Sequence, residues 1–148
     1  MKKMRGLVTV EFAIVGAALM MVIFGCLEFG RATYSLAALN EGTRRAARLA
    51  AVCPINDPKI VPAVNFLGVS GFSAANVTLK YLDAGGTPLA GTPASSTVYY
   101  VRVSVAGSIP LAIPFLSNAI SPAFTVTLPA ESLGITIAAD GSGVLTPC

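Results

Sequence analysis

Glu11 is the residue whose position most directly suggests chemistry. It is the single charged residue in an apolar stretch that spans residues 7–27. A carboxylate in the apolar interior of a membrane is costly, so we expect it to have a cationic partner. Cleavage of the peptide bond after Gly6 would create a new amine on Leu7, four residues before this carboxylate. Groups at positions i and i+4 of a helix can meet, and the same pairing can form between neighbouring chains.

The second candidate for chemistry is a pair of cysteines. Cys53 follows the helical part of the sequence, Cys148 is its last residue, and Cys26 lies inside the apolar stretch. In an oxidising compartment Cys53 and Cys148 form the natural disulfide, which would stabilise the fold by about 4 to 5 kcal/mol on the chain-entropy estimate. The alternative is two free thiols.

The sequence does not predict an enzyme. It contains no histidine, which excludes a Ser-His-Asp arrangement and a histidine metal site. Its acidic residues outside the apolar stretch are scattered, and we expect no catalytic residues, no metal and no cofactor. The formal net charge is +3, but most of the cations flank the helical segment, so we do not expect a nucleic-acid partner.

The elements that position these residues begin with a membrane helix. Residues 7–27 would form about 31 Å of helix, enough to cross a hydrocarbon core of about 30 Å. The cluster Lys2, Lys3 and Arg5 precedes this span and predicts a cytoplasmic amino terminus, with the rest of the chain outside. We expect a basic leader at residues 1–6, a transmembrane half-helix at 7–29, an amphipathic half-helix at 30–53 and a small domain at 54–148.

Residues 30–52 lack proline and continue the helix with two contrasting faces. Charged residues gather on one side, where Glu41 and Arg45 have the spacing of an ion pair, as do Glu28 and Arg31 at the membrane exit. A stripe of small or apolar residues occupies the other side: Ala32, Ser35, Leu39, Gly42, Ala46 and Leu49. We expect this stripe to pack on the chain's own domain, and the alternative is packing against other copies of the helix.

The remainder of the chain predicts a small β-rich domain. Asp57 and Pro58 can open a short helix that runs to Leu67. Alternating apolar residues then predict strands at 76–83, 97–106 and 124–128 and a weaker one at 134–138, with turns at 84–87 and 140–143. The apolar connection 109–116 either closes over the core or docks a partner. The fold class is therefore α+β, with one long amino-terminal helix packed against a mainly antiparallel domain.

The amino-terminal pattern resembles a known class of processing site. A short basic leader ends in Gly6, an apolar Leu7 follows, and Glu11 is the fifth residue after the cut, beside the aromatic Phe12. This arrangement looks like the processing site of type IV prepilins.

The following residues resemble TadE-like pseudopilins of tight-adherence (Tad/Flp) pili. Glu28, Phe29, Gly30 and Arg31 match an E-F-G-R motif that the family carries at the membrane exit. A second family motif, R-E-G-A-R, is matched by Arg44, Ala47 and Arg48, whereas Arg45 and Ala46 replace its acidic residue and its glycine. The resemblance covers roughly the first third of the chain.

This resemblance implies a minor pseudopilin with a lollipop-like pilin fold. A prepilin peptidase would cut between Gly6 and Leu7, and Glu11 would neutralise the new amine on a neighbouring subunit. The implied partners are this peptidase, other pilins or pseudopilins that contact the chain through helix packing, and the inner-membrane assembly platform. The implied location is the bacterial inner membrane, crossed once, with the carboxyl-terminal domain in the periplasm and the possibility of incorporation into an extracellular pilus.

Two other functions remain open at this point. The chain can be a signal-anchored periplasmic binding or scaffold domain that never enters a filament, because this role needs only the span and the domain. It can also be a secreted protein whose signal peptide is removed before Ala38, since Ser35 and Ala37 are small residues at the spacing that a signal peptidase requires.

Overall fold

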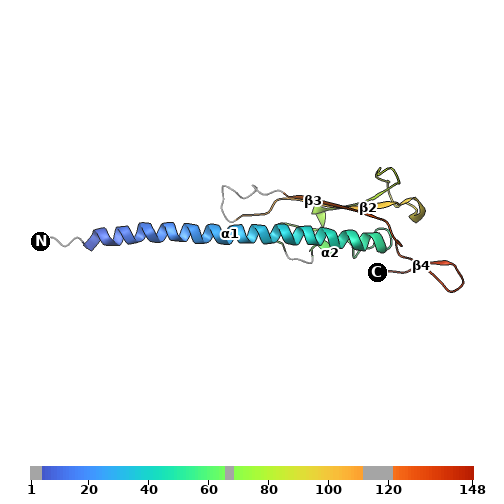
Figure 1. Ribbon diagram of the computed structural model, residues 1–148, viewed down its shortest axis with the longest axis horizontal. Helices are drawn as coiled ribbons and strands as arrows, with labels where there is room; N and C mark the ends of the chain where they lie inside the picture. Colours follow the sequence, from blue (N-terminus) through green and yellow to red (C-terminus); the bar gives the residue numbers. More distant parts are fainter. Residues whose placement is uncertain (1–4, 66–68, 112–121) are drawn as a thin grey trace. The chain divides into compact units, whose positions relative to one another are not determined.

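A computed structural model of the chain describes residues 5–65, 69–111 and 122–148. Its longest element is the helix α1, Arg5–Val52, which contains 48 residues (Figure 1). This confirms the continuous helix expected over residues 7–52. By packing, the chain divides into two compact units, Met1–Tyr34 and Ser35–Cys148, and the boundary falls inside α1. Most of the expected leader, residues 1–4, lies outside the described residues.

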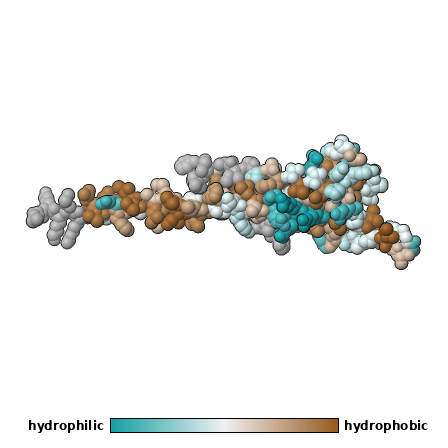
Figure 2. Space-filling view, in the orientation of Figure 1, coloured by the Kyte–Doolittle hydropathy of each residue, from teal (hydrophilic) through white to brown (hydrophobic). Residues whose placement is uncertain are grey.

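In the unit Met1–Tyr34, nearly every described side chain is exposed. Large apolar residues such as Leu7, Phe12 and Phe24 face outward, and Figure 2 shows a largely hydrophobic surface along this part of α1. Within the described part of the chain, α1 is the one helix long and apolar enough to cross a membrane, with a mean hydropathy of 2.4 in its most apolar stretch. Such a surface is stable only where lipid or other apolar helices remove it from water.

The unit Ser35–Cys148 is built on a three-stranded sheet. Its strands are β1 (Val77–Leu82), β2 (Tyr100–Ala106) and β3 (Ala123–Pro129). They lie in the order β1-β2-β3, and both neighbouring pairs are antiparallel. The register places Leu79, Val103 and Val126 beside one another across the sheet. The three expected strands are therefore confirmed within one or a few residues of their predicted ends.

The two faces of this sheet differ as the alternating sequence requires. Val101, Val103 and Val105 of β2 are buried on the inner face. On the outer face, Arg102 Nε donates to Thr127 Oγ1 at 3.1 Å. The inner face therefore supplies the core, and the outer face is polar and open to solvent.

The core of this unit joins the second half of α1 to the sheet. Helix residues of this cluster are mostly alanines, which allow close approach to the strands. Its buried members are Leu39, Ala46, Ala47, Ala50, Cys53, Ile60, Val64, Tyr81, Val98, Val101, Val103, Val105, Ile109 and Leu133. The expected packing of the helix stripe on its own domain is therefore confirmed for residues 35–50, with one correction: Leu49 is 37% exposed and lies off the stripe.

The segment after α1 differs from its prediction. Instead of a helix that opens at Asp57, the chain forms turns followed by a single helical turn, α2 (Pro62–Asn65). The Asp57 carboxylate accepts a hydrogen bond from the Lys59 N–H at 2.8 Å, and the Asp57 carbonyl accepts one from the Ile60 N–H at 3.2 Å. The N–H groups of Ala63 and Val64 likewise donate to carbonyls three residues back, so this segment is a series of tight turns and not a regular α-helix. The expected helix end at Leu67 lies outside the described residues.

The remaining elements are short. Two 3₁₀ turns, η1 (Ala74–Asn76) and η2 (Ser95–Thr97), precede β1 and β2. Strand β4 (Ile135–Ile137) confirms the weaker predicted strand, but it pairs only with β5 (Gly143–Leu145), which the sequence analysis missed. Of the apolar connection expected at 109–116, Ile109 is buried in the core, and residues 112–116 lie outside the described residues.

Candidate functional site

The expected processing site lies in the first turns of α1. Gly6, Leu7, Glu11 and Phe12 are all helical and exposed, and Leu7 and Glu11 are four residues apart on the helix. Among the side chains that the structure describes, none forms an ion pair with Glu11. Among the described side chains, the carboxylate of Glu11 therefore lies on an apolar surface with no cation paired to it.

The expected membrane-exit motif forms one ion pair. Arg31 Nη2 donates to Glu28 Oε2 at 3.1 Å, as the spacing of these residues predicted. Phe29 is exposed, and the Thr33 hydroxyl donates back to the Phe29 and Gly30 carbonyls. Because the pair is partly exposed, its net contribution to stability is small, on the order of 0.2–0.5 kcal/mol.

The residues of the second motif differ in their burial. Ala47 is 0% exposed and belongs to the core, while the neighbouring Arg44 and Arg48 are exposed. Arg45 pairs with Glu41 at 3.0 Å, as expected. Among the described residues, Arg44 and Arg48 have no anionic partner, so a surface contact in this region would use the arginines and not the alanine.

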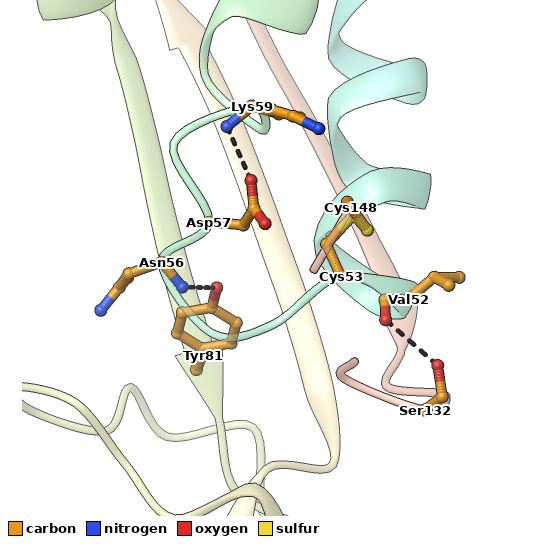
Figure 3. The surroundings of a disulfide bond; sticks show 8 residues. All are labelled: Val52, Cys53, Asn56, Asp57, Lys59, Tyr81, Ser132 and Cys148. Atoms are coloured by element: carbon orange, nitrogen blue, oxygen red, sulfur yellow. Dashed lines mark hydrogen bonds between the residues drawn. A yellow bond between two sulfur atoms is a disulfide. The ribbon is translucent and has the colours of Figure 1, made fainter. Parts of the chain in front are cut away.

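The carboxyl end of α1 is capped by a loop 80 residues away in the sequence. The last carbonyls of a helix have no partner within the helix. Here the Ala51 carbonyl accepts hydrogen bonds from the Glu131 and Leu133 N–H groups. The Val52 carbonyl accepts bonds from the Gly134 N–H and the Ser132 hydroxyl (Figure 3). Residues 131–134, which we call the cap loop, therefore replace the water or side chains that usually satisfy a helix end.

The expected disulfide is present next to this cap. Cys53 and Cys148 are bonded, with their Cα atoms 5.6 Å apart (Figure 3). The bond closes a loop over a sequence separation of 95 residues. Cys26, by contrast, is a free and exposed cysteine on α1. The disulfide and the cap loop thus fix the end of α1 to the end of the chain.

A buried tyrosine anchors the turn after the disulfide. Tyr81 is on β1, and its hydroxyl accepts a hydrogen bond from the Asn56 N–H at 2.8 Å (Figure 3). Burial raises the pKa of the Tyr81 hydroxyl above its ordinary value, the bond from Asn56 opposes this effect, and the nearby charge of Asp57 adds to it. Asn56 itself has a φ of 61°, a conformation that asparagine tolerates better than most residues.

A pocket opens beside the cap loop, and the sequence analysis did not foresee it. Its volume is about 440 Å³, and it is lined by Arg48, Ala51, Val52, Leu128, Pro129 and Glu131. These residues come from the last turn of α1, the end of β3 and the cap loop. In the described part of the chain, no group of three or more His, Cys, Asp or Glu residues is placed to hold a metal ion.

Comparison with known proteins relates the amino-terminal part of the chain to a protein family. Residues 6–48 match the family model described as TadE-like protein, so the amino-terminal part of this chain is similar to TadE-like proteins. The matched segment includes the expected processing site, the membrane-exit motif and all three residues of the second motif. No curated protein and no solved structure matches the chain.

Proposed function

We propose that this chain is a minor pseudopilin, a structural component of a Tad-type pilus system that acts without catalysis. The observation that carries the proposal is the TadE-like match over residues 6–48, which includes the exposed apolar span 7–27 and the one carboxylate within that span, Glu11. A family of pilus proteins, an apolar span that needs a membrane and a folded unit beyond that span all fit this role.

The proposed location is the inner membrane of a bacterium. The span at residues 7–29 anchors the chain as a single pass, and the cluster Lys2, Lys3 and Arg5 keeps the amino terminus in the cytoplasm. The unit Ser35–Cys148 then lies in the periplasm. An oxidising periplasm is also the compartment in which a disulfide such as Cys53–Cys148 persists.

The proposed chemistry is the removal of the leader and the pairing of the charge that it exposes. A prepilin peptidase cuts between Gly6 and Leu7 and leaves a protonated amine on Leu7. In hydrocarbon both this amine and the Glu11 carboxylate are penalised when unpaired. Packing of neighbouring helices lets the amine of one subunit meet Glu11 of another, which removes both penalties and favours one register between subunits.

The proposed partners follow from this mechanism. They are the prepilin peptidase, other pilins or pseudopilins that contact the span through helix packing, and the inner-membrane platform that assembles the pilus. The exposed apolar surface of α1 supports helix packing, since it has no partner among the described residues of the unit Met1–Tyr34.

Mass and amino-terminal sequence test the processing step. The chain would be purified from membranes of cells with and without the prepilin peptidase. We expect a mature chain that begins at Leu7 and disappears in the cells that lack the peptidase. A chain that keeps Met1 in both strains would contradict the proposal and favour an anchored periplasmic domain. A start at Ala38 would favour ordinary secretion.

Glu11→Ala tests the pairing step. We expect the variant to insert into the membrane normally, because removing a charge makes insertion easier, and to enter pili at least several-fold less well. Glu41→Ala is the matched control, since it removes a carboxylate from the same helix outside the span, where Glu41 pairs with Arg45. Equal amounts of the two variants in sheared pilus fractions would contradict the proposed role of Glu11.

A further inference from the structure

The hairpin formed by β4 and β5 exposes apolar side chains that its own chain leaves uncovered. Ile137 is 81% exposed and Leu145 is 66% exposed, and Ile135 and Val144 are also exposed. The register pairs Ile135 with Leu145, so these two and Ile137 lie on one face of the hairpin. In Figure 2 hydrophobic surface is visible at this hairpin, which lies past the carboxyl end of α1 in Figure 1. A two-stranded hairpin of this kind is marginally stable by itself.

Both ends of the hairpin are nevertheless fixed to the last residue of α1 or to the residue that follows it. At its start, the Gly134 N–H donates to the Val52 carbonyl. At its end, Cys148 is bonded to Cys53. The hairpin is therefore held in one place with its apolar face outward, an arrangement that lowers the entropic cost of docking that face against another protein.

The pocket beside the cap loop offers a surface of matching chemistry. Its lining is largely apolar and includes Ala51, Val52, Leu128 and Pro129. The lining also contains Arg48 and Glu131, and these two residues do not form a salt bridge with each other. Arg44 lies one turn before Arg48 and is also exposed, so the helical side of the pocket is cationic. None of the lining residues belongs to the hairpin of the same chain.

The turn of the hairpin carries the complementary charge. Asp140 is exposed, and its Oδ1 accepts hydrogen bonds from the Ser142 N–H at 2.9 Å and the Ser142 hydroxyl at 2.6 Å. These bonds lower the pKa of the Asp140 carboxyl below its ordinary value, so it remains an anion at neutral pH. Residues 135–148 contain no lysine or arginine. In a pocket lined by both Arg48 and Glu131, an anion is attracted to the arginine and repelled by the glutamate.

We propose that the β4–β5 hairpin of one copy docks into the pocket of a second copy, with Ile137 against the apolar lining residues and Asp140 against Arg48. The hairpin and the pocket are different surfaces of the chain, so the contact is heterologous. A heterologous contact leaves one hairpin and one pocket free at the two ends of each dimer, and it can therefore continue into an open chain of subunits. The proposal does not depend on cleavage after Gly6 or on a pilus.

Photocrosslinking of the full chain in lipid vesicles without other proteins tests the contact. Ile137 would be replaced by p-benzoylphenylalanine, and equal amounts of ¹⁵N-labelled and unlabelled chains would be mixed before irradiation. We expect crosslinked peptides that join the hairpin of one isotope to residues 51–52 or 128–129 of the other. Crosslinks confined to one isotope, to lipid or to another surface would overturn the proposal. Replacement of Thr125, which is exposed on the outer face of the sheet, is the control site.

Charge exchange tests the pairing of Asp140 with Arg48. Asp140→Arg alone and Arg48→Asp alone should each lower the yield of the interchain crosslink by roughly fivefold, because each places like charges together. A mixture of the two variants should restore it, since the hairpin of each variant then meets a pocket of opposite charge in the other. Lys80→Asp, a reversal on the outer face of the sheet, should leave the yield unchanged. A mixture in which the yield of the interchain crosslink stays low would overturn the proposal.

This experiment separates the docking contact from the pilus function. Vesicles contain neither peptidase nor assembly platform, so the crosslink reports the contact alone. A chain that forms the crosslink but is never processed in cells would retain the docking contact and lose the proposed pilus role. A chain that is processed and enters pili without forming the crosslink would retain the proposed pilus role and lose the docking contact.

Discussion

The two parts of α1 differ in how far the described chain buries their side chains. In the unit Met1–Tyr34 the helix carries large apolar side chains, such as Ile14 and Phe24, and exposes them. In the unit Ser35–Cys148 its buried side chains are mostly small, such as Ala46 and Ala50. The more hydrophobic part of the helix is thus the part that its own fold does not cover.

Side-chain size explains this difference. Alanine lets a helix approach the valines of β2 closely enough to form a dry core, whereas leucine and phenylalanine extend from the helix axis and suit a surrounding of lipid or other helices. One helix can therefore serve a membrane and a folded domain in succession. The following predictions test this contrast, in order of decreasing expected effect.

Loss of the disulfide should produce the largest effect, and only in the unit Ser35–Cys148. Cys53→Ser should lower the free energy of unfolding of this unit by about 4 to 5 kcal/mol, because the unfolded chain regains the entropy of a long open loop. Chemical denaturation followed by circular dichroism in detergent would measure it. Cys26→Ser is the control, since Cys26 is a free cysteine in the other unit, and an equal loss in this control would contradict the prediction.

The same substitution in the two parts of α1 should have different costs. Ala47→Leu overfills a fully buried position and should destabilise the unit Ser35–Cys148 by about 1 to 3 kcal/mol. Ala18→Leu adds the same side chain at an exposed position of the unit Met1–Tyr34 and should leave that stability unchanged. Denaturation midpoints of the two variants would measure the contrast, and similar values would show that both parts of the helix share one environment.

The cap loop should tolerate no side chain at Gly134. This residue has a φ of 79°, and an added Cβ would lie 2.5 Å from Pro54 Cγ. Gly134→Ala should therefore cost about 1 to 2 kcal/mol for the backbone conformation alone, and more for the contact. Gly141→Ala, with a φ of 82° and open space around it, carries the backbone cost without the contact. The midpoint temperature of thermal unfolding should be lower for Gly134→Ala than for Gly141→Ala. The reverse order would contradict the proposed packing of the cap loop.

The smallest expected effect is a loss of folding stability at alkaline pH. Because the pKa of the Tyr81 hydroxyl is raised in the folded chain, the unfolded chain loses the hydroxyl proton at a lower pH than the folded chain does. The stability that the protonated Tyr81 contributes is therefore complete below about pH 10 and is lost as pH rises through the higher folded pKa. Tyr81→Phe should cost about 1 kcal/mol at neutral pH, because the Asn56 N–H loses its acceptor.

The pH series needs its own control. The fall in stability between pH 9 and pH 11 should be shallower in Tyr81→Phe than in the natural chain. Tyr99→Phe, at an exposed tyrosine, should keep the natural slope. Identical slopes in all three proteins would rule out Tyr81 as the source of the alkaline loss.

The sequence by itself determined the features that depend on local order. The apolar run 7–27 and the proline-free, amphipathic stretch 30–52 predicted α1. The spacing of Glu28 with Arg31 and of Glu41 with Arg45 predicted the two ion pairs, and alternating residues predicted the three strands of the sheet. Each of these signals lies within one helix or strand, where periodicity and spacing are sufficient. The Cys53–Cys148 disulfide was also predictable, because the third cysteine lies in the span.

Only the tertiary structure decided the features that join distant segments. Leu49 was expected in the buried stripe and is exposed, whereas Ala47, which matches the second family motif, is in the core, because the sheet selects which side of α1 it covers. The cap loop, the pocket and the separate β4–β5 hairpin likewise depend on where residues 128–148 meet the end of α1. Hydrogen bonds and contacts across about 80 residues leave no periodic signal in the sequence, and only the folded chain brings their partners together.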